Sequence, residues 1–285
     1  MNGLTFLKLG GSLLTDKSRP YTPRQDVLAR LAAEIAPSRR SAREQALVLG
    51  HGSGSFGHTP AKEYRTREGI LPSSPGRGAA LSLSKGAGGD GNYWRGFAEV
   101  WYQASALNRL VMDALREAGL PAISLAPAAA VTAQDGKVLR WDLTPIKAAL
   151  EAGLLPVVYG DVVFDTLRGG TILSTEDLFE HLARELRPAR ILLAGLEAGV
   201  WADFPQRQLL IERITPDSFD EISRGVGGSH GADVTGGMES KVGQMLALVA
   251  QIPGLAVQIF SGEAAGNLER VLRGEVLGTK ITPNL

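Results

Sequence analysis

Short apolar runs alternate with longer amphipathic stretches along this chain, and this alternation limits the folds open to it. The apolar runs predict buried strands at 4–9, 45–50, 121–125, 155–159, 190–194 and 256–261. The amphipathic stretches predict helices at 23–36, 94–118, 142–152, 175–186 and 237–251. Because strands that alternate with helices form a mainly parallel sheet covered by helices, the pattern predicts an α/β fold.

Two hairpins and one long loop interrupt the alternation. Asp135-Gly136 predicts the tip of a hairpin over 131–139, and Gly169-Gly170 predicts the turn of a second hairpin over 162–173. Residues 69–92 are rich in glycine, serine and proline and too polar for a core, so we expect a surface loop there. The composition of this loop is as typical of a lid as of a disordered segment.

Composition excludes several classes of protein. The chain has 285 residues, enough for one large domain or two lobes. Its 30 basic and 30 acidic residues cancel, which argues against a broad surface for nucleic acid or membrane but permits a local cationic pocket. The absence of cysteine excludes disulfides and thiolate catalysis and suits a reducing cytoplasm. The N-terminus has no signal-peptide core and no apolar run reaches about 18 residues, so we expect neither export nor a membrane span.

Lysine is rare, and three of the eight lysines lie in or beside glycine clusters. The first cluster, residues 8–12 (KLGGS), follows the first predicted strand, and Lys17 lies just beyond it. Glycines after a strand let backbone amides approach an anion, and the lysines add positive charge. Asp16 stands where a Walker A loop needs glycine, which argues against a Walker-type ATPase. Taken alone, the cluster is equally typical of a turn with two solvated lysines.

The second cluster, residues 51–58 (HGSGSFGH), follows the second predicted strand. It matches the dinucleotide pattern G-x-G-x-x-G, but that site also needs a helix and a strand that ends in an acid about 20 residues later. The sequence instead continues into the polar loop, where Asp90 lies among glycines, so we do not expect a Rossmann oxidoreductase. We expect an anion-binding loop in which a histidine, with His58 favoured over His51, donates to a phosphate. The spacing of the two histidines does not favour zinc.

The third cluster, residues 235–241 (TGGMESK), opens a predicted helix. Glycines at a helix N-terminus leave amides free for an anion, and Lys241 lies one turn further on. A capped helix with an exposed lysine is the structural alternative. Together, three cationic glycine loops in a neutral protein predict one pocket for a polyphosphate and a transferring phosphoryl group. Asp161 and Asp177 are acids available to orient the lysines.

Five motifs in this order, KLGGSLLTDK, HGSGSFGH, GDVVFD, STED and TGGMESK, resemble the amino acid kinase superfamily and, within it, the isopentenyl phosphate kinases. The resemblance covers nearly the whole chain. It implies a three-layer αβα open sandwich around a mainly parallel sheet, with an acceptor lobe at 1–165 and a nucleotide lobe at 166–285. It also implies a homodimer, and the lack of cysteine leads us to expect this homodimer in the cytoplasm.

The activity implied by the resemblance is direct in-line transfer of a phosphoryl group from ATP, with Mg²⁺, to isopentenyl phosphate. The product would be isopentenyl diphosphate, for isoprenoid synthesis by an alternative mevalonate route. No base is needed when the acceptor is itself a phosphate, because its second pKa is near 6 and it is already anionic at pH 7.

The same resemblance implies a role for each motif residue. The residues implied on the nucleotide side are Lys8, Gly10, Gly11, Ser12, Ser53, Asp177, Gly237 and Lys241. The residues implied at the acceptor phosphate are Gly52, Gly57, His58 and Gly160, with the first two contributing their amides. The residues implied in catalysis are Lys8, Lys17, His58 and Asp177, and none is implied as a metal ligand.

Within these sets, Lys8 and the amides of Gly10 and Gly11 would cradle the transferring group, which Lys17 would stabilise in the transition state. Asp177 would orient Lys8 and Lys241. Ser53 departs from the motif, which has glycine at this position, and so narrows the freedom of the loop backbone.

Other functions are open at this point. A kinase of another small phosphate or phosphonate, such as a fosfomycin-like or nucleoside monophosphate kinase, would use the same phosphate residues and differ only in the pocket for the acceptor's tail. The helix expected near 94–112 offers apolar side chains for an isoprenoid tail, with ordinary core as their alternative: Trp94, Phe97, Val100, Trp101, Ala104 and Leu107. A catalytically silent protein that binds nucleotides or anions is also open, although a pure binder does not need to stabilise a transferring group.

Overall fold

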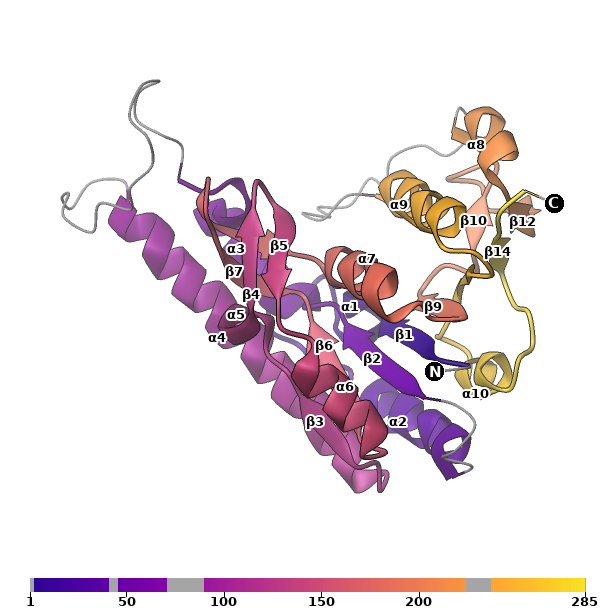
Figure 1. Cartoon of the computed structure of the whole chain (residues 1–285), viewed down its shortest axis with the longest axis horizontal. Coiled ribbons are helices and arrows are strands. Elements are labelled where there is room, and N and C mark those ends of the chain that lie inside the picture. The colour runs from indigo at the N-terminus through magenta and orange to yellow at the C-terminus, as the bar shows by residue number, and fades with distance from the viewer. Residues whose placement is uncertain (1–2, 41–45, 71–89, 224–236, 285) are drawn as a thin grey trace.

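The computed structural model describes residues 3–40, 46–70, 90–223 and 237–284, and Figure 1 shows how their elements are arranged. Residues 71–89, which make up most of the loop expected at 69–92, lie outside the described residues. The same holds for Thr235 and Gly236 of the third glycine cluster.

The centre of the molecule is an eight-stranded sheet in the order β12-β14-β13-β9-β1-β2-β6-β3. In that order the strands are β12 (Arg213–Ile214), β14 (Thr279–Ile281), β13 (Ala256–Ser261), β9 (Arg190–Gly195), β1 (Thr5–Leu9), β2 (Leu47–His51), β6 (Leu155–Tyr159) and β3 (Ala122–Ser124). Neighbouring strands are parallel except for β13 and β14. Because helices cover both faces, β1, β2 and β6 are buried at every residue and read as continuous apolar runs.

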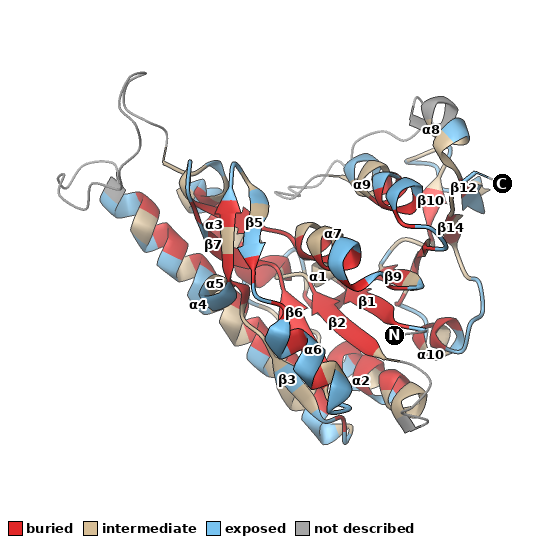
Figure 2. Cartoon of the chain, viewed as in Figure 1, coloured by how far each residue is buried: buried red, intermediate tan, exposed pale blue. Residues whose placement is uncertain are grey.

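Alternate residues of β1 point to opposite faces of this sheet and meet different helices. Phe6 belongs to a buried cluster that includes side chains of α6 (Thr144–Glu151), α7 (Thr175–Leu186) and α9 (Met238–Gln251). Leu7 belongs to a second buried cluster, with side chains of α2 (Gln25–Arg40), α4 (Asp90–Glu117) and α10 (Asn267–Leu272). Figure 2 shows the buried strands between these two layers. The three-layer αβα sandwich is therefore confirmed.

A second sheet of four strands, in the order β5-β4-β7-β8, lies beside the first. Its strands are β5 (Lys137–Trp141), β4 (Val131–Gln134), β7 (Asp161–Asp165) and β8 (Gly169–Leu173). The predicted tip at Asp135-Gly136 is confirmed, since both residues have positive φ, +50° and +75°. The turn of the second hairpin falls at 166–168, ahead of the predicted Gly169-Gly170, because Asp165 accepts hydrogen bonds from the amides of 167 and 168.

Several short elements were not predicted from the sequence. The main one is α3 (Gly54–Tyr64), a helix that starts inside the second glycine cluster where we expected only a loop. The others are α1 (Gly11–Leu14), α5 (Pro127–Ala130), α8 (Pro216–Ser223), α10, β12, β14 and the two-stranded sheet of β10 (Val200–Trp201) and β11 (Leu210–Ile211). A strand and a helix therefore do flank the G-x-G-x-x-G pattern. The next strand, β3, begins only at Ala122, so the dinucleotide arrangement is still absent from the described chain.

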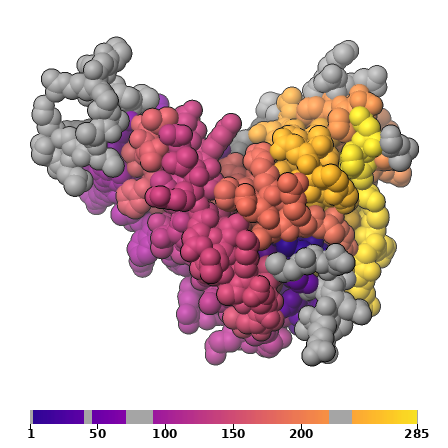
Figure 3. Space-filling view, in the orientation of Figure 1, coloured from indigo at the N-terminus to yellow at the C-terminus, as the bar shows by residue number. Residues whose placement is uncertain are grey.

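No helix among the described residues is long and apolar enough to span a membrane. In the space-filling view, the surface is hollowed between the magenta segments and the orange and yellow segments (Figure 3).

Candidate active site

A cavity of about 420 Å³ lies where β1, β2, β6 and β9 end. Ten of the predicted site residues line it: Lys8, Gly10, Gly11, Ser12, Lys17, Gly52, Ser53, His58, Gly160 and Lys241. They come from distant parts of the chain and from all three glycine clusters, and they meet here because the carboxyl ends of parallel strands share one edge of the sheet. Gly57, Asp177 and Gly237 are not among the lining residues.

Glu176, which the sequence analysis did not select, joins two of the predicted lysines. One carboxylate oxygen forms an ion pair with Nζ of Lys8, and the other lies 3.7 Å from Nζ of Lys241. Lys8 and Glu176 are buried, and Lys241 is partly exposed. Burial alone would raise the pKa of the Glu176 carboxyl, but the two ammonium groups outweigh it and lower this pKa to about 2. Glu176 therefore stays ionised and holds both lysines at the cavity wall.

The prediction that Asp177 orients the lysines is wrong. Asp177 is the third residue of α7, and its Oδ2 accepts hydrogen bonds from the backbone amide and the hydroxyl of Ser174, at 2.8 and 2.7 Å. The Ser174 hydroxyl in turn accepts from the Asp177 amide, which completes a capping box. The side chain of Asp177 thus closes the N-terminus of the helix, while Glu176, one residue earlier, faces the cavity.

The first two glycine loops pack directly against each other. A Cβ on Gly11 would lie 2.3 Å from the amide nitrogen of Gly54, and a Cβ on Gly52 would lie 2.8 Å from that of Gly11. No side chain fits at either position without moving the backbone, so glycine is required where the two loops meet. Since Gly11 and Gly52 also line the cavity, they present only main chain to it. This is the surface that a phosphate can approach closely.

Three of the amides assigned to phosphate are already bonded within the protein. Gly10 donates to the carbonyl of Ala194 at 2.8 Å, and Gly52 donates to that of Leu9 at 3.0 Å. Gly57 donates to Ser53 at 3.1 Å, and it lies inside α3, where a Cβ would strike the Ser53 side chain. The predicted roles of these three amides are therefore wrong, because the glycines serve close packing. Gly11, at the first position of α1, keeps its place at the cavity.

The two histidines of the second cluster have separate environments. His51 is fully buried, with Nε2 3.2 Å from Oδ1 of Asn108, Nδ1 3.1 Å from the carbonyl of Gly52, and its ring stacked on Tyr159. Burial lowers its pKa, so it is neutral at pH 7. His58 lines the cavity from the first turns of α3. His58 is thus the histidine that faces a ligand, and His51 is a structural residue.

Asp161 does not reach the lysines, so it is not the acid that orients them. It is fully buried, and its Oδ1 accepts a hydrogen bond from the amide of Val162 at 2.8 Å. No hydrogen-bond partner for Oδ2 is found among the described residues. Burial raises the pKa of this carboxyl to about 8, so it holds a proton at neutral pH.

Lys17 reaches the cavity from an exposed loop. Residues 15–23 form this loop, closed at its base by a bridge between Thr15 and Pro23 and by the hydrogen bond from the Asp16 amide to the Thr22 carbonyl, at 2.9 Å. The Asp16 carboxylate accepts from the amide and hydroxyl of Ser18, which with Arg19 lowers its pKa to about 2. The backbone on both sides of Lys17 is thus fixed, while its side chain is not buried.

Aromatic side chains that the sequence analysis did not select also line the cavity. Trp201 and Phe204 line it, together with Glu197 and Arg207. Glu197 accepts from the indole of Trp201 and from Arg207, all at 2.9 Å, and the guanidinium of Arg207 lies 4.9 Å from the centre of the Phe204 ring. Aromatic side chains beside a fixed charge pair, in the same cavity as the lysines, suit a nucleotide base.

The helix expected to form an apolar slot is mostly core. Phe97 and Val100 of α4 pack with Val162 and Ile172 in a buried cluster, and Trp101 is 46% exposed. Ile172 lines the cavity, but none of the six side chains proposed on α4 does. In the described part of the chain, β8 therefore contributes apolar side chains to the cavity, Ile172 and Leu173, whereas the six side chains proposed on α4 do not.

Comparison with known proteins decides the family. The sequence model of the amino acid kinase family matches residues 3–261. The chain belongs to the amino acid kinase family. It is 34% identical over 282 residues to the isopentenyl phosphate kinase of Methanocaldococcus jannaschii, with 98% of each chain covered. It is 35% identical over 287 residues to that of Methanothermobacter thermautotrophicus, covering 98% of this chain and 99% of that protein.

A solved structure of an isopentenyl phosphate kinase has the same fold. It superposes with a TM-score of 0.78 at 32% identity, and the match covers 98% of this chain and 100% of that one. The similarity therefore extends over nearly the whole length of both chains.

Proposed function

We propose that this protein transfers the γ-phosphoryl group of ATP to isopentenyl phosphate, giving ADP and isopentenyl diphosphate. The observation that carries the proposal is the convergence of Lys8, Lys17 and Lys241 with His58 on one cavity that is lined in part by bare glycine backbone. Such a site binds two phosphate groups that approach each other, because the cations offset their mutual repulsion. Full-length similarity to isopentenyl phosphate kinases supports this acceptor.

In this proposal the lysines act by position and charge. Lys8 and Lys241, held by Glu176, meet the phosphates of ATP from the sheet side, and Lys17 meets the transferring group from the opposite loop. His58 donates to the acceptor phosphate, whose own oxygen is the nucleophile. The transfer breaks the bond from Pγ to the bridging oxygen of ADP and forms one bond to the acceptor oxygen, so no protein base is required.

The nucleotide would lie along β9 and α9. Its phosphates fit near Lys8 and Lys241, and its base fits against Trp201 and Phe204, which suits a nucleotide lobe at 166–285. The acceptor would lie near His58 and Gly160, which suits an acceptor lobe at 1–165. We therefore propose an acceptor lobe at 1–165 and a nucleotide lobe at 166–285.

Magnesium fits this site as a companion of the nucleotide. Among the described residues there is no group of three side chains that could hold a metal. The two carboxylates of the lining, Glu176 and Glu197, are both in ion pairs with basic side chains. We propose that Mg²⁺ enters bound to the phosphates of ATP, where it neutralises part of their charge.

We also propose a cytoplasmic homodimer acting in isoprenoid precursor synthesis by an alternative mevalonate route. The face best suited to a second copy is the end of the large sheet at β3. Ile123 on this edge strand is 39% exposed, and Trp101 and Tyr102 of α4 are 46% and 61% exposed. Exposed aromatic side chains and an open strand edge are each typical of an interface.

The experiment is ADP formation from ATP and Mg²⁺ with single acceptors. Isopentenyl phosphate should give acceptor-dependent turnover, and dimethylallyl phosphate, fosfomycin and uridine monophosphate serve as matched phosphate or phosphonate controls. Stronger turnover of fosfomycin or uridine monophosphate than of isopentenyl phosphate would reject the proposed acceptor. ATP binding without any acceptor-dependent turnover would reject catalysis itself.

A further inference from the structure

The loop that carries Lys17 ends at Arg24, and this arginine bonds to two distant parts of the chain. Its amide donates to the carbonyl of Leu14 at 2.8 Å, and its Nη1 donates to the carbonyl of Leu13 at 3.3 Å. The same guanidinium forms a two-pronged ion pair with Glu263, with Nη1 2.9 Å from Oε2 and Nη2 against Oε1. Arg24 thus ties the end of α1 to the segment that follows β13.

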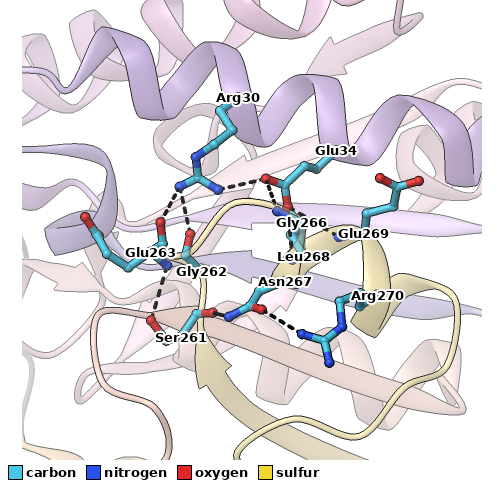
Figure 4. Close-up of polar contacts among 10 residues, drawn as sticks. All are labelled: Arg30, Glu34, Ser261, Gly262, Glu263, Gly266, Asn267, Leu268, Glu269 and Arg270. Carbon is cyan, nitrogen blue, oxygen red and sulfur yellow. Dashed lines mark hydrogen bonds and ion pairs between the residues drawn. The ribbon is translucent and has the colours of Figure 1, made fainter.

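Arg30, two turns further along α2, holds that segment by its backbone. Its Nη2 donates to the carbonyls of Gly262 and Glu263, at 2.8 and 3.1 Å (Figure 4). Its Nη1 donates to Oε1 of Glu34 at 2.8 Å. The backbone of Glu263 is therefore fixed independently of its ion pair with Arg24.

Glu34 completes the attachment at the start of α10. The carboxylate is buried, and it accepts hydrogen bonds from the amides of Gly266 and Leu268, each at 3.0 Å (Figure 4). A carboxylate at a helix N-terminus satisfies its open amides and matches its dipole. Glu34 is thus the N-terminal cap of a helix more than 200 positions away in the chain.

The clamped segment also touches α1 and the glycine loop. A Cβ on Gly262 would lie 2.7 Å from Cδ2 of Leu13, so the Leu13 side chain of α1 packs directly against the Gly262 backbone. The Gly262 amide donates to Gly195 at 2.9 Å, and the neighbouring Ala194 accepts from Gly10. A displacement of residues 262–263 would therefore reach both α1 and the cavity wall.

We propose that Arg24 and Glu263 are positioning residues that place Lys17 for phosphoryl transfer, with Arg30 and Glu34 as their support. The pair acts through the base of the loop at 15–23, since Arg24 is the residue at which this loop rejoins the fold. The proposal rests on the proposed function, in which Lys17 stabilises the transferring group. Arg24 and Glu263 are 28% and 44% exposed, so the pair contributes little to stability and its loss leaves the fold intact.

The kinetic test compares Arg24→Gln and Glu263→Gln with a matched control. Each should lower kcat about 10–100-fold and change KM for ATP less than about threefold, because small misplacement of a catalytic group has effects of this size. Arg270→Gln is the control, since it removes another arginine–glutamate ion pair, which joins Arg270 of α10 to Glu275 just after that helix. It should leave kcat within about twofold of wild type.

A Lys17→Ala background separates positioning from a general defect. If Arg24 acts through Lys17, Arg24→Gln should lower kcat less than about threefold further in this background. The proposal is overturned if Arg24→Gln lowers kcat as much in the Lys17→Ala background as in the protein that keeps Lys17. It is also overturned if Arg24→Gln leaves kcat unchanged in the protein that keeps Lys17.

Hydrogen exchange tests the clamp without turnover. The amides of Asp16 and Arg24, which bond to Thr22 and Leu14, should exchange at least about tenfold faster in Arg24→Gln than in Arg270→Gln. Equal exchange rates in the two variants overturn the clamp. A wild-type protein that does not phosphorylate isopentenyl phosphate would instead reject the proposed function, and the exchange result would still stand.

Discussion

Two of the lysines that line the cavity, Lys8 and Lys17, are held by different physical means. Lys8 is buried on a central strand and forms an ion pair with the buried carboxylate of Glu176, so this ion pair fixes its place. Lys17 is exposed on a loop, and the backbone bonds at the ends of that loop are what fix its position. A phosphoryl-transfer site can thus combine a lysine held by a buried ion pair with a second lysine whose position depends on contacts at the base of its loop.

The largest expected effect is at Lys17. Lys17→Ala should lower kcat about 10²–10³-fold with little change in KM for ATP, because its ammonium is needed most when charge develops on the transferring group. Steady-state kinetics with varied ATP measures this. A rise in KM with unchanged kcat would show that Lys17 binds ground-state ATP. Lys17 would then not differ in role from the lysines that meet the phosphates of ATP.

The neighbouring acids Glu176 and Asp177 of α7 should affect different properties, catalysis for Glu176 and stability for Asp177. Glu176→Gln should lower kcat about 10²-fold, because Lys8 and Lys241 lose the charge that aligns them. Asp177→Asn should keep kcat within about threefold and lower the free energy of unfolding by about 1 kcal/mol, as loss of a helix cap does. Steady-state kinetics and urea unfolding of both variants measure these two effects. A large loss of kcat in Asp177→Asn, with kcat kept in Glu176→Gln, would show that Asp177 orients the lysines.

The two histidines extend the comparison to the acceptor. His58→Ala should raise KM for isopentenyl phosphate at least about tenfold and leave the fold intact. His51→Ala should lower the free energy of unfolding by about 2 kcal/mol or more, because it leaves Asn108 and a buried ring site without their partner. Acceptor titrations and thermal melts measure the two effects, and a folded, fully active His51 variant would contradict its structural role.

A further expected effect is on the pH dependence of stability, and it concerns Asp161. The folded-state pKa of about 8 lies above the ordinary value of 3.8, so the folded protein binds the extra proton between these limits. Stability from this group is present below about pH 4 and is lost as pH rises toward 8, by an amount on the order of a few kcal/mol. Asp161→Asn should flatten the pH dependence of unfolding over this window. A wild-type protein that gains stability from pH 5 to 8, with the same slope in the variant, would contradict the shift.

Much of the site could be predicted because its residues lie in short local sequence motifs. The glycine clusters, their lysines and His58 follow predicted strands or open predicted helices, and parallel topology then brings them to one edge. The error at Asp177 was avoidable in principle. With Ser174 as N-cap, Asp177 occupies the position from which a side chain reaches back to the cap, so the acid left for the lysines was Glu176.

Other features depend on contacts that no local pattern contains. The helix α3 contains glycine, serine and proline, which have weak helix propensity. It forms because burial of Phe56 and Ala61 outweighs that propensity. Arg24 and Glu263 are 239 positions apart in the sequence, and each looks like an ordinary surface charge. Trp201 and Phe204 reach the cavity through short strands and turns that carry little sequence signal.

The most direct test of the central claim is a crystal structure with ADP, isopentenyl phosphate and a planar mimic of the transferring phosphoryl group. We predict that the mimic lies within hydrogen-bond distance of the ammonium groups of both Lys8 and Lys17, with His58 on the acceptor phosphate and Glu176 behind Lys8. A mimic bound with Lys17 turned to solvent, or with Asp177 in place of Glu176 against the lysines, would contradict the account.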